Sequence, residues 1–149
     1  VINTGFRKHK KFGNASSSSA AKWLNIHRFE DRDECIKVLR GRYEKLYASY
    51  LGEGSRSFYD VDFTESMALV FGNERDGIGA EMLAECDGSF VIPQMGMIRS
   101  LNISVACAIT LYEAMRQRKD KGYYDGKPRL SPSELEILGA KWRAKVKKR

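Results

Sequence analysis

Apolar runs alternate with amphipathic stretches along this chain, which predicts strands and helices in turn. Met67–Phe71 is a continuous apolar run that stops at Gly72, and residues 90–92 form another that stops at Pro93. Unbroken apolar runs of this length are typical of strands buried on both faces of a parallel sheet. Residues 46–51 and 23–27 predict two further strands. Residues 1–3 resemble the end of another strand, and a glycine- and serine-containing loop is expected over residues 5–20.

Helix signals lie between these strands. Asp31 is expected to cap a helix, since Glu34 stands three residues later in the capping-box position. A short helix is predicted over residues 80–86 and a long one over residues 103–118. Ser131, followed by Pro132 and Glu134, starts a last helix. This alternation predicts an α/β fold with a mostly parallel sheet and flanking helices.

Composition narrows the class of protein. The chain has 149 residues and is 42% hydrophobic, which suits one compact domain. No apolar run approaches the roughly 20 residues of a membrane helix, so no membrane partner is expected. The three cysteines, Cys35, Cys86 and Cys107, are far apart, so neither a disulfide framework nor a CxxC metal site is expected. These features predict a reducing, cytoplasmic location.

Charge gives the first indication of a partner. The chain has 26 Lys and Arg against 19 Asp and Glu, a formal net charge of +7. Two stretches that contain no acid, residues 5–22 and 141–149, hold this excess, and the remainder is mildly acidic. Basic stretches on an acidic body predict a polyanion partner such as nucleic acid. The alternative is that both are solvated segments that aid solubility.

Two loops follow the predicted buried strands, where ligands bind in parallel sheets. The loop at residues 72–79 has three glycines. Its Glu74 is expected either to accept hydrogen bonds from a ligand or the loop amides, or to be a surface carboxylate that caps the following turn. The loop at residues 93–102 sets polar groups among apolar ones, as small-molecule sites do. Its Ser100 and Asn102 contact a ligand or cap the following helix. Met95 and Met97 are interpreted as core or pocket wall.

Several common sites are absent from the sequence. There is no GxxxxGK[ST] phosphate loop and no GxGxxG after a strand. His9 and His27 are far apart and have no partner motif, so metal chemistry and Ser-His-Asp chemistry lack support.

The two loops together carry a family resemblance. Residues 69–78 resemble the second motif of the SPOUT-superfamily RNA ribose 2′-O-methyltransferases, and residues 92–106 resemble their third motif, in the same order and at a fitting separation. The similarity continues through residues 112–118. Residues 122–130 resemble the corresponding segment of the bacterial tRNA guanosine 2′-O-methyltransferases.

The resemblance implies a fold, a cofactor and a set of site residues. The fold would end in a C-terminal trefoil knot, and S-adenosylmethionine would bind, without a metal, in the knotted loops. Cofactor contacts would fall at Ser49, Gly72, Ile92 and Leu101. Catalytic roles would fall to Glu74, Ser100 and Asn102, and RNA contacts to Arg7, Lys8, Lys10, Lys11, Arg116 and Arg118. The family's members are homodimers that act on RNA.

The same resemblance leaves alternatives open. Residues 1–130 would form the methyltransferase domain and residues 131–149 a basic C-terminal helix. The family's first motif, with an Asn and an activating Arg, would precede the first strand seen here, so its N-terminal segment is expected upstream of Val1. A ribosomal-RNA 2′-O-methyltransferase and a catalytically silent RNA-binding knot protein are the alternatives to a tRNA-modifying enzyme.

Overall fold

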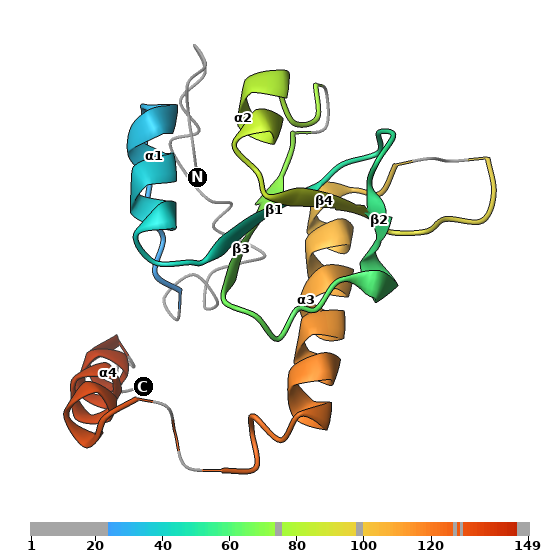
Figure 1. Ribbon diagram of the computed structural model, residues 1–149. Helices are drawn as coiled ribbons and strands as arrows, with labels where there is room; N and C mark the ends of the chain where they lie inside the picture. The colour runs from blue at the N-terminus through green and yellow to red at the C-terminus, as the bar shows by residue number, and fades with distance from the viewer. Residues whose placement is uncertain (1–23, 74–75, 98–99, 127, 129, 146–149) are drawn as a thin grey trace. The chain divides into compact units, whose positions relative to one another are not determined.

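The computed structural model describes residues 24–73, 76–97, 100–126, 128 and 130–145 (Figure 1). The chain forms two compact units. One comprises residues 36–126, and the other combines residues up to 35 with those from 127 onward. No helix in the described ranges is long and apolar enough to cross a membrane.

A parallel sheet forms the centre of the unit at residues 36–126. Its strands are β1 (Lys45–Ser49), β2 (Arg56–Ser57), β3 (Met67–Phe71) and β4 (Gly88–Val91), in the order β2-β4-β1-β3. Every pair is parallel, and Tyr47 on β1 lies opposite Leu69 on β3 and Gly88 on β4. The carboxyl ends of β1, β3 and β4 therefore meet at one edge. This arrangement confirms the predicted α/β fold with a mostly parallel sheet.

Helices α1 (Arg32–Arg40), α2 (Ala80–Ala84), α3 (Ile103–Asp120) and α4 (Pro132–Lys145) begin where the sequence predicts. Asp31 caps α1, since its Oδ1 accepts the Glu34 N–H at 2.7 Å. At α4, the Ser131 Oγ accepts the Glu134 N–H and the Glu134 carboxylate accepts the Ser131 N–H, so the capping box is confirmed.

One predicted strand is absent, and one observed strand is not predicted. Residues 24–27 form no strand, so that prediction is wrong there, while Trp23, residues 1–3 and the loop at residues 5–20 lie outside the described residues. The strand β2 was not predicted, because two residues are too few to show a periodic pattern.

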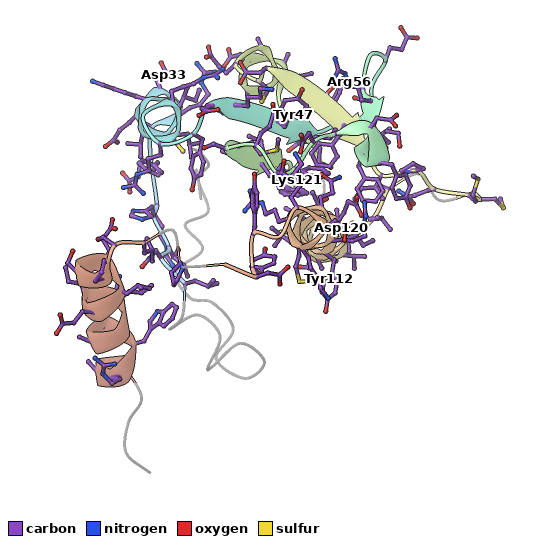
Figure 2. All side chains as sticks on the ribbon, turned by 60° about the horizontal axis from the view of Figure 1, so that its bottom comes forward. Asp33, Tyr47, Arg56, Tyr112, Asp120 and Lys121 are labelled. Atoms are coloured by element: carbon purple, nitrogen blue, oxygen red, sulfur yellow. The ribbon has the colours of Figure 1, made fainter. Side chains whose placement is uncertain are left out.

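The core lies between the sheet and α3. Phe63 and Phe90 are fully buried and meet edge to face, with ring centroids 5.6 Å apart. Ala106 of α3 belongs to the same cluster. Thr110 is fully buried one turn later, and its hydroxyl donates to the Ala106 carbonyl at 2.8 Å, so its burial leaves no unpaired polar group. Figures 1 and 2 show α2 and α3 on opposite sides of the sheet.

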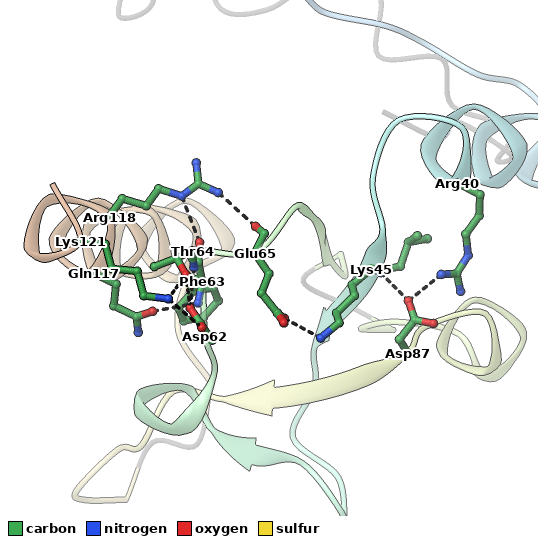
Figure 3. A network of polar contacts seen from close by, with 11 residues as sticks. Arg40, Lys45, Asp62, Phe63, Thr64, Glu65, Asp87, Gln117, Arg118 and Lys121 are labelled. Carbon is green, nitrogen blue, oxygen red and sulfur yellow. Dashed lines mark hydrogen bonds and ion pairs between the residues drawn. The ribbon is translucent and has the colours of Figure 1, made fainter. Parts of the chain in front are cut away.

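A polar network fixes the last turns of α3 to the segment before β3 (Figure 3). The Gln117 amide accepts the Phe63 N–H at 2.8 Å and donates to the Val61 carbonyl at 3.0 Å. Lys121 Nζ donates to Thr64 Oγ1 at 2.6 Å and to Asp62 Oδ2 at 3.1 Å. These contacts set the position of α3, whose other end lines the candidate site.

The network makes acid stability depend on Asp62. The pKa of Asp62 falls from 3.8 to about 2, because Thr64 donates two hydrogen bonds to its carboxylate and Lys121 donates a third. Its contribution to stability is therefore complete above the pKa of the unfolded chain and is lost as the pH falls toward about 2. We expect Asp62→Asn to lower the free energy of unfolding at pH 6 by less than about 1 kcal/mol, since the pair is half exposed.

Urea titrations between pH 6 and pH 2 test this expectation. The gap between wild type and Asp62→Asn should narrow below about pH 4. Asp125→Asn, a change of the same kind outside the network, is the control. A gap that stays constant with pH would show that the ionised carboxylate contributes nothing.

Candidate cofactor site

A cavity of about 530 Å³ lies at the sheet edge where β1, β3 and β4 end. It is lined by residues 49–51, 71–73, 76–78, 90–92, 94, 100–103 and 106. Each of these segments either ends a strand, belongs to one of the two loops, or begins α3. The volume lies within the range of small-molecule sites, and the lining mixes apolar side chains with a few polar groups, as such sites do.

The cavity brings together six of the residues that the sequence predicted. Ser49, Gly72, Ile92 and Leu101, the expected cofactor contacts, all line it. Ser100 and Asn102 line it as well. Their roles in binding and catalysis remain predictions. Glu74 lies outside the described residues, as do the expected RNA contacts Arg7, Lys8, Lys10 and Lys11.

The glycine loop is held by its own backbone. Asn73 and Gly77 exchange two N–H···O bonds of 3.1 Å, and the Asn73 side chain accepts the Asp76 N–H at 2.8 Å. Gly77 has a φ of +66°, which a residue with a side chain rarely adopts. A Cβ on Gly72 would overlap the Gly77 carbonyl and lie 2.6 Å from the Ile78 nitrogen. The loop therefore requires glycine at both positions.

The second loop ends in a helix cap. Asn102 is the N-cap of α3, since its Oδ1 accepts the Ser104 N–H at 2.9 Å. The capping interpretation is therefore confirmed for Asn102. The cap uses Oδ1, and the amide nitrogen makes no hydrogen bond to the described residues. Asn102 thus combines a structural oxygen with an amide nitrogen that is free for a ligand.

Met95 and Met97 correct the interpretation of that loop. Both side chains are 100% exposed, so they belong neither to the core nor to the cavity wall. Gly96 between them has a φ of +133°. Figure 1 shows the β4–α3 connection extending away from the sheet, which explains why apolar residues there remain in solvent.

The expected RNA contacts on α3 have partners within the chain. Arg116 pairs with Glu113 and Asp120, at 2.7 Å in each case. Arg118 Nε donates to the Phe63 carbonyl at 3.0 Å, as part of the polar network. Phosphate contacts at both residues remain predictions, and such contacts would compete with these interactions.

The structure adds cavity residues that the sequence did not single out. Asn73, Asp76 and Gln94 are lining residues with polar side chains, and Tyr50 and Leu51 extend the lining beyond β1. The sequence signal that could have found them is their position in or beside the two loops and the strand that ends at Ser49. Their place at the cavity depends on turn geometry.

The chain is similar to known RNA methyltransferases. Residues 1–112 match the model of the SpoU rRNA methylase family. The chain is 41% identical over 129 residues to a tRNA (guanosine(18)-2′-O)-methyltransferase of Thermus thermophilus, covering 87% of this chain and 66% of that protein. It therefore spans about two thirds of the length of this relative.

Solved structures agree with the sequence relatives. The crystal structure of the TrmH/SpoU tRNA modifying enzyme of A. aeolicus superposes with a TM-score of 0.81 at 36% identity, covering 95% of this chain and 72% of that one. The SpoU methyltransferase AviRb of Streptomyces viridochromogenes, in complex with the cofactor AdoMet, gives a TM-score of 0.64 at 30% identity, covering 70% of this chain and 43% of that one. The resemblance in the two loops is thus confirmed, and the chain belongs to the SpoU rRNA methylase family.

Proposed function

We propose that the protein transfers a methyl group from S-adenosylmethionine to a ribose 2′-hydroxyl of RNA, with a guanosine of tRNA as the target. One observation carries this proposal. The cavity at the carboxyl ends of the strands gathers all four expected cofactor contacts with Ser100 and Asn102, in a chain of the SpoU family. The tRNA-modifying relatives support the substrate class, and AviRb with its bound cofactor supports the ligand.

The lining suits S-adenosylmethionine, which supplies an electrophilic methyl group. The apolar side chains of Phe71, Ile92 and Leu101 offer surface for a purine ring, and the strand ends offer backbone groups for its polar edge. Ser100 and Asn102 at the start of α3 would orient the ribose, because the weakly acidic 2′-hydroxyl must be held in line with the methyl group. Glu74 would support the glycine loop.

Methyl transfer to tRNA tests the proposal directly. In separate reactions, the protein is incubated with methyl-labelled S-adenosylmethionine and either unmodified tRNA transcripts or ribosomal RNA, and nucleosides are separated after digestion. We expect the label in a 2′-O-methylguanosine. Label in ribosomal RNA alone would favour the alternative that the family's description names, an rRNA methylase. Cofactor binding without any transfer would favour a catalytically silent RNA-binding protein.

Two basic segments support the tRNA partner. We expect the affinity for tRNA to fall steeply with salt, by roughly 0.7–0.9 in the log–log slope for each phosphate neutralised. Replacing the basic residues at 141–149 by glutamine should reduce that slope, measured by filter binding between 50 and 300 mM salt. Affinity for the cofactor, measured in parallel, should not change. An unchanged slope would show that the C-terminal segment serves solubility only.

We also propose that the protein is a homodimer that pairs through α3. The exposed apolar side chains of this helix are Val105, Leu111, Tyr112 and Met115. Their spacing places them on one stripe, opposite the buried Ala106 and Thr110. Figure 2 shows Tyr112 turned away from the sheet. An exposed apolar stripe of this kind, which no described residue covers, marks an interaction site. Sedimentation velocity tests whether a second copy occupies it.

Other features of the proposal rest on the family resemblance. The C-terminal part would form a trefoil knot around the cofactor loops, and transfer would need no metal. Residues 1–130 would be the methyltransferase domain and residues 131–149 a basic helical segment that contacts RNA. The location would be the cytoplasm.

A further inference from the structure

The described lining of the cavity contains an acidic residue that no basic residue of the lining balances. Among its described lining residues, Asp76 is the only one whose side chain is charged at neutral pH. The rest of this lining is apolar side chains, hydroxyls, amides and backbone groups, with no Lys or Arg. The described lining of the cavity therefore contains one acidic residue and no basic residue.

Asp76 is held at the cavity by a rigid turn. Its backbone N–H donates to Asn73 Oδ1 at 2.8 Å, and the paired backbones of Asn73 and Gly77 close the loop around it. The carboxylate itself is exposed and makes no hydrogen bond or ion pair with the described residues. Its backbone is thus fixed at the cavity, and no described residue competes with a ligand for its carboxylate.

We infer that Asp76 selects the charge of the ligand, favouring a cationic adenosyl compound over a neutral one. This inference rests on the proposed function, because it assumes that the cavity binds S-adenosylmethionine. That molecule carries a sulfonium, an ammonium and a carboxylate, and so has one net positive charge. When the S–CH₃ bond breaks and the methyl group bonds to the ribose oxygen, the electron pair stays on sulfur. The product is a thioether with no net charge, and the 2′-hydroxyl proton passes to solvent.

The selection has two consequences for this site. The substrate gains electrostatic attraction that the product loses, so Asp76 would hold S-adenosylmethionine more tightly than S-adenosylhomocysteine. It would also disfavour adenosine phosphates, whose negative charges it repels. Because Asp76 is exposed to solvent, the effect is modest. We expect about a three- to fivefold difference in affinity, typical of an exposed charge pair.

Isothermal titration calorimetry tests the inference with three ligands. They are S-adenosylmethionine, S-adenosylhomocysteine and sinefungin, which has an ammonium group in place of the methylsulfonium. The wild type is expected to bind the two cationic ligands more tightly than S-adenosylhomocysteine. Asp76→Asn keeps the backbone hydrogen bond to Asn73. It should lower the ratio of the affinity for each cationic ligand to the affinity for S-adenosylhomocysteine by about three- to fivefold. Its affinity for S-adenosylhomocysteine should change little.

Two variants serve as controls. Asp76→Glu keeps the charge and should keep the preference, and Asp60→Asn removes an exposed carboxylate outside the cavity and should leave all three affinities unchanged. The preference of the wild type should shrink between 50 and 500 mM salt. If Asp76→Asn retains the full preference, the inference is wrong while the proposed function stands. If the wild type binds none of the three ligands, the proposed function fails and the inference with it.

Discussion

Asn102→Ala is expected to lower the rate of methyl transfer to tRNA by about a hundredfold, the cost of a reacting group misplaced by a short distance. Asn102 stands where the second loop enters α3, and its Oδ1 is fixed by the Ser104 N–H. That bond orients the whole amide, so the nitrogen can hold the ribose or its phosphate at one position. Affinity for S-adenosylmethionine should stay within a few-fold of wild type, because the expected cofactor contacts are mainly backbone groups.

Asn102→Ala also removes the helix cap, which by itself is expected to lower the free energy of unfolding by about 1 kcal/mol. Asn102→Ser and Asn102→Asp separate the two roles, since both keep a capping oxygen and both lack the amide nitrogen. We expect the two variants to have near-wild-type stability in urea and single-turnover rates as low as that of Asn102→Ala. Wild-type rates in Asn102→Ser would show that Asn102 acts only as a cap.

The arrangement of strands and helices could largely be predicted from the sequence. Met67–Phe71 is a strand over the predicted residues, and α3 begins at the predicted Ile103. Both signals are local, since an unbroken apolar run indicates a buried strand and a capping residue marks the start of a helix. The order of the strands does not follow from such signals, because it depends on how distant segments pack.

The predictions that fail concern apolar residues that are exposed in the structure. Residues 24–27 have the apolar content of a strand, yet Leu24 and Ile26 are exposed and lie outside any strand. Met95 and Met97 are apolar and nevertheless fully exposed. In both places the apolar composition predicts burial, but burial is decided by tertiary contacts that a single sequence does not contain.

The sequence predicts where the candidate site lies, but it does not predict every residue that lines the cavity. The rule that ligands bind at the carboxyl ends of parallel strands selects the two loops. The resemblance to a family adds the individual contacts. The sequence does not single out Asp76 as a cavity residue, because its place there depends on the bond between its N–H and Asn73 and on the positive φ of Gly77. Neither feature leaves a periodic trace in the sequence.

Gly72→Ala is expected to weaken the binding of S-adenosylmethionine by about tenfold to a hundredfold, and to lower the free energy of unfolding by about 1–3 kcal/mol. A Cβ at this position would overlap the Gly77 carbonyl and lie 2.6 Å from the Ile78 nitrogen. These are backbone atoms of the loop that lines the cavity, so no rotation of a side chain can relieve the clash. The Asn73–Gly77 pairing must open, and the cavity wall must move with it.

Gly79→Ser is the matched control in the same loop. A Cβ at Gly79 meets no atom within 4 Å, and its φ of −64° suits any residue. Gly79 is also the N-cap of α2, a position that serine favours, so this variant should bind the cofactor as the wild type does and be at least as stable. Calorimetry with S-adenosylmethionine and urea titration compare the two variants. Wild-type affinity in Gly72→Ala would separate the glycine loop from the cofactor site, whereas equal losses in both variants would mean that the whole loop, rather than the contact between Gly72 and Gly77, is sensitive to substitution.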